Sequence, residues 1–344
     1  MNTGESLTPR DYSVLFCNCD DCLCRRVGRM TALPRVGFVG LGKLGLPVAL
    51  AMSSRTGEVV RGFDLNPDVK KYVAAKAVPY EEARVSEFFE SALVVVDDSI
   101  DELLDNTDLV FLAVQTPHEK TFEGVTPVPT QAQDFDYSHL VGAVTSIADY
   151  LQRHPHRELT LSVISTVLPG TMVSQVFPAL KNVENQVRFC YNPFFIAMGS
   201  TIDDFLNPEF VLIGEKNPGD SQDLARLYSV VHDAELHLIE IESAELAKVA
   251  YNTFIGFKIV FANSLSEIVS NRGGDVDEVT GALAKATDRL LSPKYLRAGM
   301  GDGGGCHPRD QIAMSWLAGE LGLSANIFDF LARARDAQTL SQAK

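Results

Sequence analysis

The hydrophobic positions change their spacing along the chain, and from about residue 35 short apolar runs alternate with longer amphipathic segments. Short apolar runs bounded by polar or turn residues predict buried strands. The predicted strands are Arg35–Val39, Val59–Phe63, Leu93–Val96, Asp108–Val114, Leu159–Ile164, Val187–Cys190, Phe210–Ile213 and Leu236–Ile241. Helical stretches lie between most of them. This alternation is typical of an α/β fold with a doubly wound parallel sheet that carries helices on both faces.

The pattern changes after residue 241. Glu242–Asn271 contains no Pro and a single Gly, and its apolar residues lie on more than one side of a helix. We expect one long helix, buried on several sides, that connects two domains and contributes a dimer contact. A small all-helical domain follows, built from Asp275–Lys285, Arg309–Leu321 and Ala325–Thr339. The expected domains are therefore residues 31–241 and 242–344.

The first strand runs into a glycine-rich turn, which contains Gly40, Gly42 and Gly45 and precedes an apolar helical run, Leu46–Met52. This strand–turn–helix context is that of the dinucleotide fingerprint, in which the three glycines make the turn, admit the pyrophosphate and let the helix pack on the strand. The pyrophosphate then lies at the helix N-terminus. We predict a Rossmann-like domain in which the cofactor lies against Gly40, Gly42, Lys43, Leu44 and Gly45.

The second strand ends at Asp64, at the distance of about 20 residues at which this fold places its ribose-binding acid. A carboxylate there accepts hydrogen bonds from both ribose hydroxyls and repels a 2′-phosphate. The predicted cofactor is therefore NAD rather than NADP, and no metal is predicted.

Length and charge narrow the classes of function. The 344 residues suffice for two domains, and the formal net charge is −15 with no basic run, which argues against a nucleic-acid partner. No apolar run approaches the roughly 18 residues that span a bilayer. We find no signal peptide, so the expected location is the cytoplasm.

A cysteine cluster, Cys17, Cys19, Cys22 and Cys24, precedes the first strand. Thiolates suit zinc or copper(I), but two Cys-X-Cys pairs are tighter than the usual zinc spacing. The first 29 residues also show no periodic pattern. We expect residues 1–30 to be a disordered or non-native extension, and a chain that starts at Met30 to fold and bind NAD.

The last cysteine stands in a second glycine-rich segment, Gly299–Asp310. Cys306 follows Gly303–Gly305, and Pro308 suits the first position of a helix. Cys306 is therefore expected just before a helix N-terminus, where the positive end of the helix dipole lowers the pKa of a thiol and favours the nucleophilic thiolate. This predicts a covalent active site on a loop. An inert cysteine in a flexible loop is the alternative.

Polar residues follow several predicted strands and share one face of the long helix. Thr116 and Thr166 stand at strand ends, where a doubly wound sheet binds its ligand. Lys248 and Asn252 are four residues apart, so they lie on the same helix face. These residues could converge with Cys306 on one pocket. A solvated lysine beside an exposed asparagine is the alternative.

With these motifs the chain resembles the UDP-glucose/GDP-mannose dehydrogenase family over residues 35–339. The segments that carry the resemblance are VGFVGLGKLGLPVAL, FLAVQTP, ISTVLPGT, YNPFF, DDFLNPEFVLIG, AELAKVAYNTFIGFKIVFANS and GGGCHPRD. Members of the family oxidise the 6-hydroxymethyl group of a nucleotide sugar to a carboxylate with two NAD. The resemblance therefore implies an NAD-dependent oxidoreductase with a sugar nucleotide as its small-molecule substrate.

The resemblance also implies catalytic roles. Cys306 is similar to the nucleophile that forms a thiohemiacetal and then a thioester. Lys248 is similar to the cation that stabilises the oxyanion, and Asn252 to the residue that holds the substrate. Asp310 is similar to the acid that positions a water for proton transfer with Thr166.

Further binding residues follow from the same resemblance. Arg289 resembles an arginine that reaches the substrate across a homodimer. The remaining implied contacts are Phe194, Phe195 and Gly303 with the substrate, and Thr116, Thr166 and Arg309 with NAD.

The chain departs from the family at several positions. Phe194 replaces the family's Glu that serves thioester hydrolysis, and Met198 replaces a later acid of the same motif. His307 beside the thiol is a candidate replacement base, or a surface histidine. The chain ends at Lys344, where the family's nucleotide-sugar-binding third domain would begin, so we expect that domain to be lacking.

Two other functions remain open from the sequence. A two-domain β-hydroxyacid dehydrogenase shares the glycine-rich start and a lysine with an asparagine four residues later, and it needs no cysteine. A degenerate homologue that binds NAD without turnover is favoured by the lost Glu and the expected lack of the third domain. It is opposed by the retained Cys306, Lys248, Asn252, Thr166 and Asp310.

Overall fold

The computed structural model describes residues 32–117, 133–292 and 306–342. Two compact units divide the chain, Met1–Val249 and Ala250–Lys344. The boundary lies inside the long helix, whereas the sequence analysis put it where that helix begins. No helix in the described part of the chain combines the length and apolarity that crossing a bilayer requires. The N-terminal cysteine cluster and the glycine-rich residues before Cys306 lie outside the described residues.

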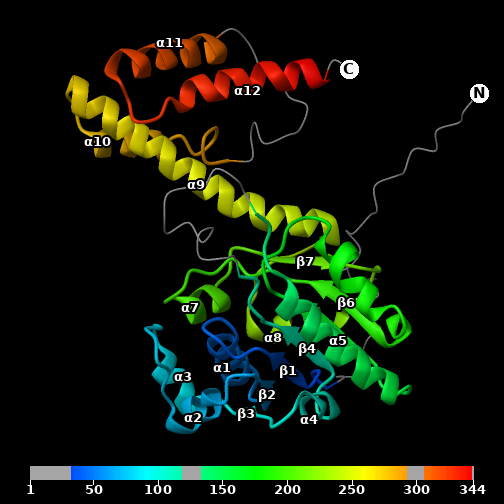
Figure 1. Ribbon diagram of the computed structural model, residues 1–344. Helices are drawn as coiled ribbons and strands as arrows, with labels where there is room; N and C mark the ends of the chain where they lie inside the picture. The colour runs from blue at the N-terminus through cyan, green and yellow to red at the C-terminus, as the bar shows by residue number, and fades with distance from the viewer. Residues whose placement is uncertain (1–31, 118–132, 293–305, 343–344) are drawn as a thin grey trace, which may run out of the picture. The chain divides into compact units, whose positions relative to one another are not determined.

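The first unit is built on one eight-stranded sheet with the order β3-β2-β1-β4-β5-β6-β7-β8 (Figure 1). The strands are β1 Val36–Val39, β2 Val60–Phe63, β3 Val94–Val96, β4 Leu109–Leu112, β5 Leu159–Val163, β6 Val187–Tyr191, β7 Val211–Glu215 and β8 Leu236–Glu240. All eight predicted strands are confirmed, with ends shifted by a few residues. The Rossmann-like prediction is also confirmed, because β1 lies between β2 and β4 with parallel pairing on both sides.

Helices cover both faces of this sheet (Figure 1). They are α1 Gly45–Thr56, α2 Asp68–Ala75, α3 Val85–Ser91, α4 Ile100–Asp105, α5 Ser138–Arg153, α6 Phe177–Leu180, α7 Thr201–Leu206 and α8 Gln222–Val231, with a π-helix at Met172–Val176 and a 3-10 turn at Glu184–Gln186. Strand residues alternate between two cores: Phe38 and Phe111 pack with α1, α7 and α8, and Val39 and Leu112 pack with α4 and α5. The central strands β1 and β4 are buried at every position, so their sequences are apolar throughout apart from Gly37.

One pairing differs from the predicted parallel sheet: β7 runs antiparallel to β6. The connection between them, residues 192–210, carries a single six-residue helix, α7. Because β7 runs antiparallel to β6, this connection leaves β6 and enters β7 on the side of the carboxyl end of β6.

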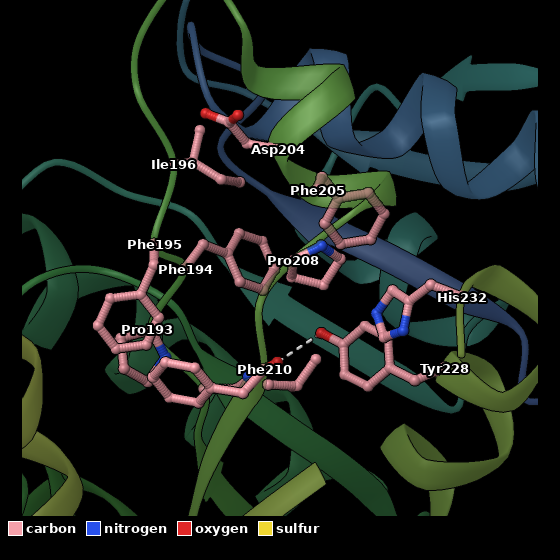
Figure 2. A pocket seen from close by; sticks show the side chains of 12 residues that line it. Pro193, Phe194, Phe195, Ile196, Asp204, Phe205, Pro208, Phe210, Tyr228 and His232 are labelled. Atoms are coloured by element: carbon pink, nitrogen blue, oxygen red, sulfur yellow. Dashed lines mark hydrogen bonds between the residues drawn. The ribbon is translucent and has the colours of Figure 1, made fainter. Parts of the chain in front are cut away.

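Asn192 fixes the start of this connection. Its side chain is fully buried, and its Nδ2 donates to the carbonyl of Leu212 at 2.8 Å. The hydroxyl of Tyr228 on α8 donates to Asn192 Oδ1 (Figure 2). One amide therefore joins the end of β6 to β7 and to α8.

The second unit is helical, as predicted. It comprises the later part of α9 (Ile241–Arg272) together with α10 Val276–Leu283, α11 Cys306–Leu321 and α12 Ile327–Gln342. The rings of Phe261 and Phe328 meet edge to face at 6.4 Å, and Glu267 on α9 accepts from the backbone N–H and the hydroxyl of Ser324. These contacts join α9 to the first turn of α12 and to the segment that precedes it.

One local expectation for this unit is untested and one needs correction. Helix α11 spans Cys306–Leu321 in the described part of the chain, and the residues directly before Cys306 lie outside that part, so the place of Cys306 relative to the helix N-terminus stays a prediction. Pro308 still fits, because the first N–H groups of a helix have no partner within it. The long helix was expected to be buried on several sides, yet Phe254, Phe257 and Ile259 are 55%, 44% and 56% exposed. An apolar pattern does not distinguish burial within a chain from burial by another molecule.

We predict that Asn192→Ala lowers the free energy of unfolding by about 2–4 kcal/mol, because the Leu212 carbonyl and the Tyr228 hydroxyl lose their buried partner. Urea denaturation measures this. Asn207→Ala is the matched control: its side chain is exposed and bonds only the Asp203 carbonyl, so the change should stay within about 0.5 kcal/mol. Equal effects of the two substitutions would contradict the role of Asn192.

Candidate active site

The glycine-rich turn has a backbone that only glycine allows. Gly40 has φ +95°, and a Cβ there would lie 2.7 Å from the carbonyl oxygen of Ala113. A Cβ on Gly45 would lie 2.1 Å from the carbonyl oxygen of Gly40. The N–H of Gly40 donates to the carbonyl of Phe63 at 2.9 Å, which ties the turn to the end of β2. Two of the three glycines are therefore required by close packing.

The third glycine faces open space. No atom lies within 4 Å of the position that a Cβ on Gly42 would take. Helix α1 begins directly after the turn, and Leu44 at its N-cap makes no side-chain cap hydrogen bond. The first N–H groups of α1 and the free surface at Gly42 therefore form a cradle that fits a pyrophosphate. Lys43 lies beside it, with its Nζ 5.9 Å from the centre of the Tyr80 ring.

Asp64 lies at the end of β2 and already holds the turn in place. Its Oδ2 accepts from the N–H of Leu41 at 2.7 Å, and its Oδ1 accepts from the N–H of Asn66 at 2.7 Å. Each carboxylate oxygen has further lone pairs, so Asp64 can also accept from ribose hydroxyls. The negative charge beside them fits NAD and disfavours a 2′-phosphate.

The ends of β4 and β5 are joined side by side. Thr116 Oγ1 donates to the carbonyl of Thr166 at 2.7 Å, and Ser165 Oγ donates to the carbonyl of Val114 at 2.5 Å. The structure thus brings together two of the residues that the sequence assigned to this site. Both threonines are partly exposed, at the carboxyl edge that carries the glycine-rich turn.

Lys248 on α9 is buried against the segment that follows β6. Its side chain is 7% exposed, and its Nζ donates to the carbonyl of Phe194 at 2.7 Å. The same nitrogen lies 4.9 Å from the centre of the Phe195 ring. Burial lowers the pKa of this amine below its ordinary value, since desolvation disfavours the charged form. The interpretation of Lys248 as a solvated surface lysine is therefore wrong.

Phe194 presents its backbone, not its ring, to Lys248. The ring lies 5.5 Å from that of Phe205 and 6.5 Å from that of Phe111, centre to centre, and points into the apolar cluster beneath the connection (Figure 2). Phe195 turns the other way and packs on Phe210 at 4.9 Å. Phe194 is partly buried, and its predicted contact with a substrate stays a prediction.

The cavity in this cluster is too small for a substrate. It measures about 20 Å³, which is room for about one water molecule. His232 lines it, stacked on Tyr228, and neither ring nitrogen has a hydrogen-bond partner among the described residues (Figure 2). Burial lowers the pKa of His232, because desolvation disfavours the charged ring. The cavity is a small gap in the side-chain packing between the segment that follows β6 and helix α8.

Glu245 is a buried acid beside this site that the sequence analysis missed. Its side chain is fully buried, and its two oxygens accept from the N–H groups of Gly170 at 2.6 Å and Met172 at 2.8 Å. Burial raises the pKa of this carboxyl despite both bonds. Glu245 and Lys248 share one face of α9 at a spacing of three residues. An acid on an otherwise apolar helix face, one turn before the lysine, was the available signal.

The remaining predicted residues belong to the second unit. Asn252, Arg289, Arg309 and Asp310 are exposed there, and Arg309 pairs with Asp310 at 2.9 Å. His307 is exposed on α11, and Gly303 lies outside the described residues. The convergence of these residues with Lys248 stays a prediction. Among the described residues no group of His, Cys, Asp and Glu could hold a metal ion.

Comparison with protein families gives two adjoining matches. Residues 34–232 match the model described as the UDP-glucose/GDP-mannose dehydrogenase family, NAD binding domain. Residues 242–336 match the central domain of the same family. The interval between the two matches contains β8 and ends where α9 begins.

Individual relatives agree with these matches. The chain is 26% identical over 305 residues to a UDP-glucose 6-dehydrogenase of Rickettsia bellii (strain RML369-C), covering 87% of this chain and 66% of the relative. It is 29% identical over 313 residues to a GDP-mannose 6-dehydrogenase of Pseudomonas syringae pv. tomato, covering 88% and 68%. The chain thus spans about two thirds of the length of these relatives.

A solved structure shares the fold. A ternary complex of GDP-mannose dehydrogenase from Pseudomonas aeruginosa superimposes with a TM-score of 0.80 at 25% identity. The superposition covers 88% of this chain and 69% of the other.

We predict that this protein binds NAD more tightly than NADP. Asp64→Ala should weaken NAD binding about tenfold to a hundredfold, since it removes charged acceptors from the ribose hydroxyls. Asp64→Asn is the matched control, because it keeps an acceptor for the Leu41 N–H while it removes the charge, so it should narrow the preference with less loss of stability. Calorimetric titration with each cofactor measures this. Equal affinity of the native protein for NAD and NADP would refute the role of Asp64.

Proposed function

This chain belongs to the UDP-glucose/GDP-mannose dehydrogenase family, and we propose that it catalyses the NAD-dependent oxidation of a primary alcohol of a nucleotide sugar. The NAD-binding domain of the family spans residues 34–232, and the glycine-rich turn with Asp64 fits that cofactor. The observation that carries the proposal is Lys248, a buried amine at the strand edge with no ion-pair partner among the described residues.

The proposed chemistry begins with removal of two electrons from the alcohol. NAD supplies the hydride acceptor, and the hydroxyl proton leaves to a base, for which we propose the water held by Asp310 and Thr166. Lys248 then stabilises the negative charge that develops on the substrate oxygen, because a fixed cation in a water-poor site interacts strongly with an oxyanion.

A second stage uses the thiol. The Cys306 thiolate adds to the aldehyde carbon and, with uptake of a proton, forms a thiohemiacetal. Loss of its hydroxyl proton to the base and of a second hydride to a second NAD leaves a thioester. A place near the N-terminus of α11 suits Cys306 for this role, since the positive end of the helix dipole favours the thiolate. Water then cleaves the thioester to the carboxylate and returns the thiol. Asn252 and Arg289 are the proposed substrate contacts of the second unit.

The β-hydroxyacid dehydrogenase alternative is not favoured. Both parts of the chain match one family, and the residues for a thiol mechanism are present. The two readings differ in their need for Cys306: a Cys306→Ser variant with full activity would favour a hydroxyacid dehydrogenase.

We predict that thioester hydrolysis is the slow step. Phe194 cannot activate water, and general-base assistance is typically worth about 10²–10⁴-fold in rate. The protein, incubated with NAD and a UDP- or GDP-hexose, should therefore either accumulate an acyl adduct on Cys306 or release aldehyde with one NADH. Intact mass and absorbance at 340 nm separate these outcomes, and Cys306→Ser should abolish the adduct. Rapid release of carboxylate with two NADH per turnover would contradict the prediction, and His307→Ala would then be the next variant.

We also propose a homodimer through α9, because large apolar side chains on its second-unit part are about half exposed. Sedimentation should give twice the mass of one chain. Ile259→Glu should shift the mass toward a monomer, since it places a charge in the apolar contact. Asn271→Glu on the same helix replaces an exposed polar residue and should leave the dimer intact. A monomeric native chain at micromolar concentration would refute the proposal.

A further inference from the structure

We propose that Phe195 is a positioning residue for Lys248. Its ring and the carbonyl of Phe194 together hold the lysine in its charged form, pointing toward the carboxyl edge of the sheet. This inference deepens the proposed function and rests on it for its catalytic meaning. The geometry itself stands on described contacts of the first unit alone.

Two groups meet the ammonium from adjacent residues. The carbonyl oxygen of Phe194 accepts one of its three N–H bonds at 2.7 Å, and the face of Phe195 lies 4.9 Å away. Aromatic faces attract cations at distances up to about 6 Å, and more strongly where water is excluded. At 7% exposure Lys248 has little water to replace either group.

Both groups are held by packing on opposite sides of the backbone. The ring of Phe194 is anchored on Phe111 and Phe205, which fixes the direction of its carbonyl. The ring of Phe195 is backed by Phe210, which limits its rotation away from the lysine (Figure 2). The alternation of two consecutive aromatic residues thus presents one carbonyl and one ring to the same nitrogen.

No carboxylate takes this place in the described part of the chain. Glu245 is the acid one turn earlier on α9, but backbone N–H groups take both of its oxygens. Asp204, in the connection after β6, accepts from the N–H of Ala197 and the hydroxyl of Ser200. The loop after β5, Ser165–Thr171, contributes no titratable side chain. The charged form of Lys248 therefore depends on the carbonyl and the ring.

The experiment measures the ionisation of Lys248 directly. Competitive labelling of the full chain with acetic anhydride across pH, read by peptide mass spectrometry, gives the pKa of each lysine without any turnover. Phe195→Leu should lower the pKa of Lys248 by about half a unit to one unit, because it removes a group that favours the cation. Phe195→Tyr keeps an aromatic face and should stay close to the native value.

Internal controls are present in the same digest. Lys216 lies 4.8 Å from the ring of Phe177, remote from the substitution in sequence, and its labelling should not change in either variant. Melting temperature and NAD affinity report whether the Leu variant is folded. An unchanged or raised pKa of Lys248 in a folded Phe195→Leu protein would overturn the inference.

A second readout separates this inference from the proposed function. If the native protein turns over a nucleotide sugar, the alkaline limb of kcat/KM should move to lower pH in Phe195→Leu and return in Phe195→Tyr. If it turns over none, the proposed function fails while the labelling still decides the positioning of Lys248. A limb that stays in place despite a lowered pKa would show that Lys248 is positioned but not used.

Discussion

The hydrogen bond from the buried amine of Lys248 to the carbonyl of Phe194 is the contact on which the site depends. It joins the helix that leaves the sheet to the segment that follows β6. The bond requires that this segment stay at the carboxyl edge, which the antiparallel direction of β7 and the buried amide of Asn192 ensure.

One face of α9 holds two strand ends at once. Glu245 binds the N–H groups of the loop after β5, and Lys248 binds the carbonyl of the segment after β6. Donors and acceptors are matched in each case: a carboxylate meets N–H groups and an ammonium meets a carbonyl. Both ions are thus buried with hydrogen bonds, which is the condition under which buried charge is tolerated. The loop that carries Thr166 and the segment that carries Phe195 are therefore fixed relative to a single helix.

The strands, the glycine-rich turn and the long helix could be predicted because their signals are local. A run such as Leu109–Leu112 is apolar in every position, and Gly40 is required by its own backbone angle. The direction of β7 could not be predicted, since strand composition carries no direction. The orientation of Phe194 depends on Phe111 and Phe205, which are distant in sequence, and Glu245 resembles a solvent-facing acid until its N–H partners are known. Long-range packing decided each of these three features.

We propose that Lys248 acts as a cation on the substrate and not on the cofactor. The most direct measurement is a single turnover, in which native protein and Lys248→Met are mixed rapidly with NAD and a nucleotide sugar and followed at 340 nm. Lys258→Met, an exposed lysine on the same helix, is the control. We predict that Lys248→Met lowers the rate of the first NADH increase by about 10²–10³-fold and leaves the affinity for NAD unchanged. A first rise at the native rate in Lys248→Met would contradict it.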